Sequence, residues 1–160
     1  MKILVFSDSH GRGKRIVDAI KDHGGTCDAV IFLGDGVGEI DYVKAQFPNL
    51  IFFSVRGNGD LFAPDHIRDD ALIDIDGIKI YLAHGHKHRV KLTYDIIVTH
   101  AASLGADAVF FGHTHIPHSS CEYVGDKRIQ LFNPGSIGTG GTYGVVNTVK
   151  GVLVTGFGNV

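Results

Sequence analysis

The stretch ILVFSDSH at residues 3–10 indicates the fold class, because a continuous apolar run leads directly into polar side chains. A short run such as residues 3–6 is typical of a strand that is buried on both faces of a parallel sheet. In open α/β sheets, ligands bind beyond the carboxyl ends of the strands. Asp8 and His10 therefore stand where such a sheet carries a binding site.

The alternation of strand and helix continues through the first third of the chain. Apolar runs at 29–33 and 50–55 predict two more buried strands. Apolar residues at helical spacing over 13–23 and 38–46 predict the helices between them. This βαβαβ order implies a parallel sheet with right-handed crossover connections.

The remainder of the chain changes to a mainly antiparallel pattern. Strands at 71–75 and 78–82 flank an Asp-Gly pair, which is the strongest short hairpin signal. A helix is expected over 93–104 and a further strand over 108–111. Four antiparallel strands are expected near 117–123, 127–131, 142–149 and 152–157. Periodicity alone leaves open whether all these strands form one sheet or two.

Length and composition limit the classes of protein to consider. A chain of 160 residues predicts a single domain over 1–160, and 44% hydrophobic with 20% charged residues excludes a disordered chain. A net charge of −2 lacks the basic excess of general nucleic-acid binders, so no stable duplex partner is expected. No apolar run approaches the roughly 18 residues of a membrane span, so no membrane partner is expected. The apolar run after Lys2 is too short for a signal-peptide core, which predicts a cytoplasmic protein.

Carboxylate, amide or imidazole side chains follow the predicted strands repeatedly, most of them beside a glycine. Any one such fragment is more often a turn or a structural histidine, but their shared placement after strands favours convergence on one rim. All offer oxygen or nitrogen, which suits divalent ions such as Mn²⁺, Fe²⁺, Zn²⁺ or Co²⁺. The set is too large for one tetrahedral zinc and suits two metals bridged by one carboxylate. Its members are Asp8, His10, Asp35, Asn58, His84, His113 and His115.

In their order along the chain, these fragments resemble the motif series of the calcineurin-like metallophosphoesterases. A further segment, NPGS at 133–136, resembles one found in the small bacterial and archaeal phosphodiesterase branch of that family. The resemblance spans residues 8–136, which is most of the chain. The matching fragments are DSH at 8–10, GD at 34–35, GNGD at 57–60, HGH at 84–86 and GHTH at 112–115.

The resemblance implies an α/β fold of the four-layer αββα type, with two mixed β-sheets face to face and helices outside. It also implies two divalent metal ions, most commonly Mn²⁺ in similar enzymes, with nickel, iron and zinc also found. One ion would take Asp8, His10 and His115, with Asp35 bridging to the second ion. The second ion would take Asp35, Asn58, His84 and His113.

The activity implied by the resemblance is that of a dinuclear metal-dependent phosphodiesterase. A hydroxide bridging the two metals would attack phosphorus in line with the leaving oxygen of a small phosphate ester. Asp35 and Asn58 are the expected catalytic residues, because one bridges the metals and the other also has an amide N–H to offer the phosphate. Similar proteins form dimers or tetramers, so a homo-oligomer is an open expectation.

One position departs from the motif series: Gly59 stands where many members carry histidine and where the small branch often carries cysteine. Glycine cannot protonate a leaving group, and general acid catalysis typically contributes about 10²–10⁴-fold. Activated diesters should therefore be turned over better than alkyl monoesters. His86 is either a replacement acid pointing into the site or an imidazole beside it, and the sequence leaves both interpretations open.

Other polar residues near the motifs also have two interpretations. Asp60 either orients a group behind the metals or caps a turn. Lys87 and Arg12 either contact a polyanionic substrate or belong to a solvated face. The glycine-rich segment 138–142 lacks the strand, helix and lysine of a phosphate loop, and is expected to be a flexible connection.

Two alternative functions share this fold. The first is a catalytically weak or inactive interaction scaffold, because a retromer subunit of vacuolar sorting resembles the same fold, and Gly59 leaves turnover open. A large exposed apolar patch on the outer face would favour it. The second is a nuclease or nucleotide phosphodiesterase, which has the same chemistry and differs only in the surface around the metals.

Overall fold

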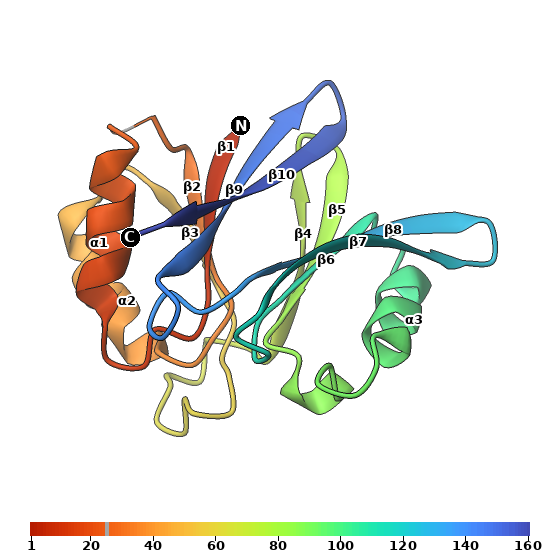
Figure 1. Cartoon of the computed structure of the whole chain (residues 1–160), viewed down its shortest axis with the longest axis horizontal. Helices are drawn as coiled ribbons and strands as arrows, with labels where there is room; N and C mark the ends of the chain where they lie inside the picture. The colour runs from red at the N-terminus through yellow and green to blue at the C-terminus, as the bar shows by residue number, and fades with distance from the viewer. Residues whose placement is uncertain (25) are drawn as a thin grey trace.

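The computed structural model describes residues 1–24 and 26–160, and in it two five-stranded sheets face each other (Figure 1). Sheet A consists, in spatial order, of β10 (Val152–Asn159), β9 (Thr142–Val149), β1 (Lys2–Phe6), β2 (Ala29–Phe32) and β3 (Ile51–Ser54). Sheet B consists of β4 (Asp70–Ile75), β5 (Ile78–Ala83), β6 (Ala108–Phe111), β8 (Lys127–Pro134) and β7 (Pro117–Val124). Both sheets mix parallel and antiparallel neighbours.

Helices form the two outer layers of the structure. Helices α1 (Gly13–Asp22) and α2 (Ile40–Gln46) pack on sheet A, and α3 (Asp95–Ser103) packs on sheet B (Figure 1). Two short 3-10 turns, η1 (Val37–Glu39) and η2 (His86–His88), precede α2 and α3. The predicted four-layer αββα sandwich is therefore confirmed, and the question of one sheet or two is answered as two.

Strand β1 is buried on both faces, which explains the continuous apolar run at residues 3–6. Ile3 and Val5 pack in the core between the two sheets, whereas Leu4 and Phe6 pack in the core beneath α1 and α2. All four side chains are fully buried. Burying such a side chain contributes about 1.5–3 kcal/mol, so both faces of β1 help to hold three of the four layers together.

The last third of the chain differs from its sequence-based interpretation in two places. Strand β8 runs to Pro134 instead of ending near 131, because it continues to pair with β7 as far as Pro117. The segment 138–142 is not a flexible connection. The N–H of Gly138 donates to the carbonyl of Asp8 over 3.1 Å, and Arg15 Nη1 donates to the carbonyl of Gly138 over 3.0 Å.

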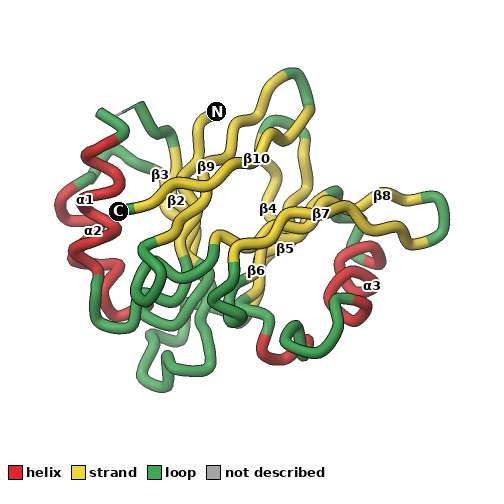
Figure 2. The backbone as a smooth tube through the Cα atoms, in the orientation of Figure 1, coloured by secondary structure: helices red, strands yellow, loops and turns green. Residues whose placement is uncertain are grey.

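The loops at the carboxyl ends of β1, β2, β3, β5 and β6 gather at one end of the sandwich, the lower end in Figure 2. Each of the three hairpin turns, β4–β5, β7–β8 and β9–β10, lies at the opposite end of its own sheet; in Figure 2 the β4–β5 and β9–β10 turns point upward and the β7–β8 turn points to the right. No helix in the described residues is long and apolar enough to cross a membrane. Location in the cell and oligomeric state stay predictions of the sequence.

Candidate metal centre

The loops that follow β1 and β2 are joined by backbone hydrogen bonds. The N–H of Asp8 donates to the carbonyl of Gly34 over 2.9 Å, and the N–H of His10 donates to the carbonyl of Asp35 over 3.2 Å. Both loops leave the carboxyl ends of adjacent parallel strands. The first two sequence fragments therefore lie side by side on the rim of sheet A.

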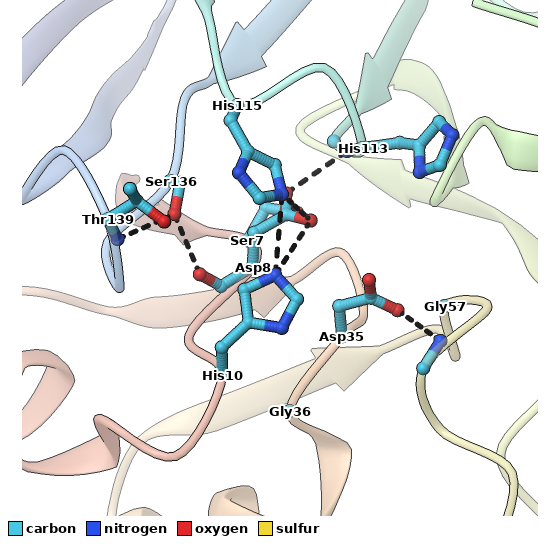
Figure 3. A network of polar contacts seen from close by, with 12 residues as sticks. Ser7, Asp8, His10, Asp35, Gly36, Gly57, His113, His115, Ser136 and Thr139 are labelled. Atoms are coloured by element: carbon cyan, nitrogen blue, oxygen red, sulfur yellow. Dashed lines mark hydrogen bonds and ion pairs between the residues drawn. The ribbon is translucent and has the colours of Figure 1, made fainter.

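A first group of donor atoms consists of Asp8, His10 and His115. Asp8 Oδ1 lies 3.1 Å from His115 Nε2 and 3.9 Å from His10 Nε2, and the two imidazole nitrogens are 3.3 Å apart. Figure 3 shows both rings turned toward each other and toward the Asp8 carboxylate. Asp8 is buried and the two rings are partly exposed, so this group opens toward solvent.

A second group consists of Asp8, Asp35 and His84. His84 Nε2 lies 3.5 Å from Asp35 Oδ2 and 3.8 Å from Asp8 Oδ1. His84 Nδ1 donates to the carbonyl of Leu33 over 2.7 Å. Because that bond uses the N–H of the ring, Nε2 keeps its lone pair and faces the two carboxylates, as in a metal-ligating histidine.

The donor set fits a divalent cation. Asp8 Oδ1 and His84 Nε2 are buried and have no hydrogen-bond partner within the described residues. Leaving a buried polar atom unpaired costs about 1–3 kcal/mol. A cation ligated by both atoms would remove that cost, and carboxylate with imidazole suits divalent first-row metals. Asp8 belongs to both groups, whereas the resemblance assigns the bridging role to Asp35.

Electrostatics shift the pKa values of two central side chains in opposite directions. Burial opposes ionisation of Asp35, but the adjacent His84 imidazole and the Gly59 N–H outweigh it, so the pKa of this carboxyl lies well below its usual value. Burial likewise lowers the pKa of His84, and the carboxylates of Asp35 and Asp8 outweigh it, so this pKa is raised. Both shifts mean that the carboxylates of this cluster attract positive charge.

Backbone strain is concentrated at the same place. A positive φ is uncommon for residues other than glycine and costs about 1–3 kcal/mol where it is held. Such strain persists only where the surroundings over-determine it, and it gathers at functional sites. Five of the expected metal ligands adopt it: Asp8 (φ 55°), His10 (45°), Asp35 (58°), His113 (67°) and His115 (62°).

His113 and Asn58 occupy the edge of the centre. The His113 N–H donates to Asp8 Oδ2 over 3.0 Å, but its ring points away from the first group (Figure 3) and lies 5.0 Å from the ring of His84. Burial, together with the charges of His84 and Lys91, lowers the pKa of His113 to about 4. Asn58 is exposed in the loop after β3, next to Gly59, whose N–H donates to Asp35 Oδ1 over 2.6 Å.

Asp60 ties together the loops that carry Asp35 and Asn58. Its Oδ2 accepts the N–H of Asp35 over 2.7 Å and that of Gly57 over 2.8 Å. Its Oδ1 accepts the N–H groups of Gly36 and Val37, over 2.8 and 2.9 Å. One half-buried carboxylate thus fixes backbone on both sides of the centre, which combines the two interpretations of Asp60 that the sequence left open.

This arrangement of strand ends, strained loops and shared carboxylates agrees with known proteins. A sequence model of the calcineurin-like phosphoesterase superfamily domain matches residues 1–151. The chain belongs to this superfamily. A probable metallophosphoesterase of Bacillus subtilis, YsnB, is 36% identical over 138 residues, which cover 86% of this chain and 75% of that protein.

Two solved structures of phosphoesterase type show the same fold. One is a conserved protein of Streptococcus pneumoniae, described as a predicted phosphoesterase, with a TM-score of 0.79 and 26% identity over 99% of this chain and 88% of that one. The other is an archaeal phosphodiesterase, with a TM-score of 0.70 and 26% identity over 98% of this chain and 99% of that one. The resemblance identified from the motifs is therefore confirmed.

Gly59, the departure from the superfamily's motif series, lies tightly against the centre. A Cβ at this position would lie 3.1 Å from Asp35 Oδ1 and 3.3 Å from its carboxyl carbon. The Gly59 N–H itself donates to Asp35 Oδ1 over 2.6 Å. A side chain here would be tight against Asp35, and glycine offers the carboxylate only its backbone N–H.

Of the remaining predicted residues, Lys87 and Arg12 have polar partners beside the centre, whereas the buried Nδ1 of His86 has none in the described residues. The ring of His86 lies 5.5 Å from that of His84, and burial and the positive charge of His84 lower its pKa. Lys87 pairs with Asp69. Arg12 Nη1 donates to the carbonyl of Gly138. Both cations therefore hold neighbouring segments together.

Sequence reasoning missed Glu39 and gave no role to the segment at 133–136. Glu39 Oε1 accepts the N–H of Gly11 over 2.6 Å and the hydroxyl of Ser9 over 3.0 Å, so it fixes the loop on both sides of His10. Asn133 Nδ2 donates to the carbonyl of Gly112 over 2.9 Å, and Ser136 Oγ donates to the carbonyl of Asp8 over 2.8 Å. No sequence pattern signals the role of Glu39, whereas the NPGS fragment signalled these two residues without indicating what they hold.

Proposed function

We propose that this chain is a dinuclear metal-dependent phosphodiesterase that acts on small phosphate esters. The observation that carries the proposal is the pair of donor groups that share Asp8, with two buried atoms left unpaired. In the proposed assignment, one ion is held by Asp8, His10, His115 and Asp35. The other ion is held by Asp35, Asn58, His84 and His113, and Mn²⁺ is the preferred metal.

When bound, such a metal pair supplies an activated water and neutralises charge on the phosphoryl oxygens. The water oxygen forms a bond to phosphorus as the ester P–O bond breaks, and the products are a phosphomonoester and an alcohol. The exposed amide of Asn58 donates to a phosphoryl oxygen, where charge increases in the transition state. Asp60 fixes the backbone of the Asp35 loop, and Glu39 fixes the backbone of the loop that carries His10.

Gly59 directs the specificity of the proposed reaction. With no imidazole at this position, the leaving oxygen departs without a proton from it, so esters with acidic leaving groups react fastest. His86 has a pKa lowered by burial and is a weak replacement, because its neutral form has no easily released proton to give. We therefore expect aryl diesters to be better substrates than alkyl monoesters.

The test uses metal-stripped protein to which Mn²⁺, Ni²⁺, Zn²⁺ or Mg²⁺ is returned singly. Hydrolysis of a nitrophenyl diester and of the matching monoester is measured, together with the number of metal ions bound per chain. We expect metal-dependent diester cleavage in the wild type and its loss in Asp35→Asn and His84→Ala. The matched controls Asp126→Asn and His66→Ala change exposed residues outside both donor groups and should keep wild-type rates.

Two results would contradict the proposal. Binding of two ions without turnover of any ester would favour the scaffold alternative. Cleavage restricted to dinucleotides or short single strands, with no turnover of nitrophenyl diesters, would favour the nucleotide alternative. Equal loss of activity in the two control variants would show that the assay reports stability and not the centre.

A further inference from the structure

Large apolar side chains are exposed on the loops that carry the predicted metal ligands. The four most exposed in the described part of the chain are Phe62 (98%), Leu92 (84%), Leu61 (82%) and Ile116 (67%). All four lie on the loops that carry the fragments GNGD, HGH and GHTH. Single exposed apolar residues need no explanation, but four gathered at the rim of one site indicate contact with a ligand.

Three of these side chains line two separate clefts, Leu61 and Phe62 the first and Ile116 the second. One cleft, of about 190 Å³, is lined by Gly59, Asp60, Leu61, Phe62 and the adjoining 63–64, with Gly38 opposite. It reaches the centre directly, because Gly59 donates its N–H to Asp35.

The second cleft, of about 340 Å³, is lined by Val90, Lys91, Tyr94, Thr114 and Ile116. It also adjoins the centre, since Thr114 lies between His113 and His115 in the chain. Tyr94 forms its aromatic wall and is itself held by Phe111, with the ring centroids 5.2 Å apart.

The two clefts adjoin the centre at different ligands, one at Asp35 and the other at the loop of His113 and His115. In Figure 1 the loop 57–64 lies below sheet A and the segment 90–94 lies below sheet B. The loop 112–116 lies between these two segments in this view. A phosphodiester has one substituent on each side of its phosphorus, whereas a monoester has only one. An apolar cavity of about 150 Å³ holds a benzene ring, so each cleft has room for one ring.

We propose that these two clefts bind the two substituents of the substrate, which is a phosphodiester with an aromatic or apolar ring on each side. This inference rests on the proposed function and names its substrate class. Phe62 and Leu61 contact one ring, and Tyr94 and Ile116 contact the other. Lys91, exposed at the second cleft, complements the negative charge of the diester.

Clefts of this size suit single rings better than a protein partner or a lipid surface. A stable protein interface needs about 1,000 Å² of buried surface or more. Here the apolar walls are divided by a polar centre of carboxylates and imidazoles, so they form no continuous patch. Stacking of a ring on an aromatic side chain contributes enough to change affinity by about tenfold or more.

The test measures binding separately from turnover. Dibenzylphosphinate has the shape of diphenyl phosphate with CH₂ in place of the ester oxygens, so it has no bond to hydrolyse, and diethylphosphinate is its small counterpart. Calorimetric titration of Zn²⁺-loaded protein should show dibenzylphosphinate binding about tenfold more tightly or better. Phe62→Ser and Ile116→Ser should each reduce that preference about fivefold. Both positions are exposed, so neither change removes core packing.

Matched controls are Tyr123→Ser and Val154→Ser, which remove exposed apolar side chains on β7 and β10, outside both clefts. They should keep the preference of the wild type. Equal binding of the two phosphinates, or an equal loss in the controls, would overturn the inference. Diester hydrolysis without a preference for dibenzylphosphinate would support the proposed function and overturn the inference about the clefts. A preference without hydrolysis by any metal form would overturn the proposed function and keep the clefts as a binding site.

Discussion

At the metal-site end of the sandwich, glycine lets neighbouring loops approach each other, whereas at the hairpin end it lets the chain turn. A Cβ at Gly112 would overlap the Ser7 hydroxyl and lie 2.9 Å from Asp8 Oδ2, and one at Gly57 would overlap the Asp35 carboxylate. By contrast, Gly125 in the β7–β8 turn has a positive φ and open space around its missing side chain. Glycine is therefore needed at one end because a side chain would not fit, and at the other because the backbone has a positive φ.

The two ends also treat polar atoms differently. At the hairpin end, the Asp76 carboxylate joins the sheets by accepting hydrogen bonds from the Met1 ammonium and the Thr148 hydroxyl. At the metal-site end, Asp8 Oδ1 and His84 Nε2 are buried without a partner in the described structure. Polar side chains thus hold the two sheets together at one end, whereas potential ligand atoms are left unpaired at the other. This is the usual arrangement when loops on a rigid scaffold carry function.

The largest contrast is expected for alanine at the two kinds of glycine. Gly112→Ala forces Ser7 and Asp8 apart, so it should lower the free energy of unfolding by about 1–3 kcal/mol and weaken metal binding by about 10–100-fold. Gly125→Ala should cost about 1 kcal/mol through its left-handed backbone and leave metal binding unchanged. Urea unfolding of metal-free protein and a Zn²⁺ titration measure both effects. Wild-type metal affinity in Gly112→Ala would refute the packing role.

A smaller contrast is expected for two aspartates that accept backbone hydrogen bonds. Asp60→Asn loses the charge that holds N–H groups of two loops, so diester hydrolysis should fall about 10–100-fold. The matched variant Asp74→Asn affects a single N–H, that of Gly77 in an exposed turn, and should keep wild-type rates. Initial rates at saturating Mn²⁺ decide the matter. If both variants kept full activity, Asp60 would be a cap without influence on the centre.

The smallest effect is expected at the hairpin end and depends on pH. The Thr148 hydroxyl and the Met1 ammonium lower the pKa of Asp76 below 3.8, so its contribution to stability is present above that pH and lost as the pH falls through the lowered value. Asp76→Asn should therefore narrow the difference in urea midpoint between pH 6 and pH 2.5, and metal binding at neutral pH should not change. An unchanged difference would mean that the contact contributes nothing in solution.

Most of the fold and the gathering of the site could be predicted from the sequence. The apolar runs around 3–6 and 108–111 indicate buried strands, and the polar residues after strand ends favour convergence at one rim; the structure has both. The division into two sheets followed from the family resemblance alone, because strand periodicity carries no information about which strands share a sheet.

What could not be predicted depends on contacts between distant segments. The role of Glu39 depends on how η1 faces the His10 loop, and the hydrogen bonds of the segment 138–142 depend on Arg15 and the Asp8 carbonyl. The apolar rim was also missed, since Leu61 and Phe62 in sequence are an ordinary apolar pair. Only the structure shows that both are exposed next to Gly59.

The position of β1 has a consequence for how the protein is made. This first strand pairs with β9, so that Leu4 lies opposite Val145, and the Asp8 loop needs Ser136 and Gly138 to complete its hydrogen bonds. During synthesis the Asp8 loop can therefore complete these contacts only after residues 136–149 have left the ribosome. Contacts across such long stretches of chain close slowly. Metal loading should thus follow the synthesis of β9, and a chain that stops before β9 would have these ligands but no ordered site.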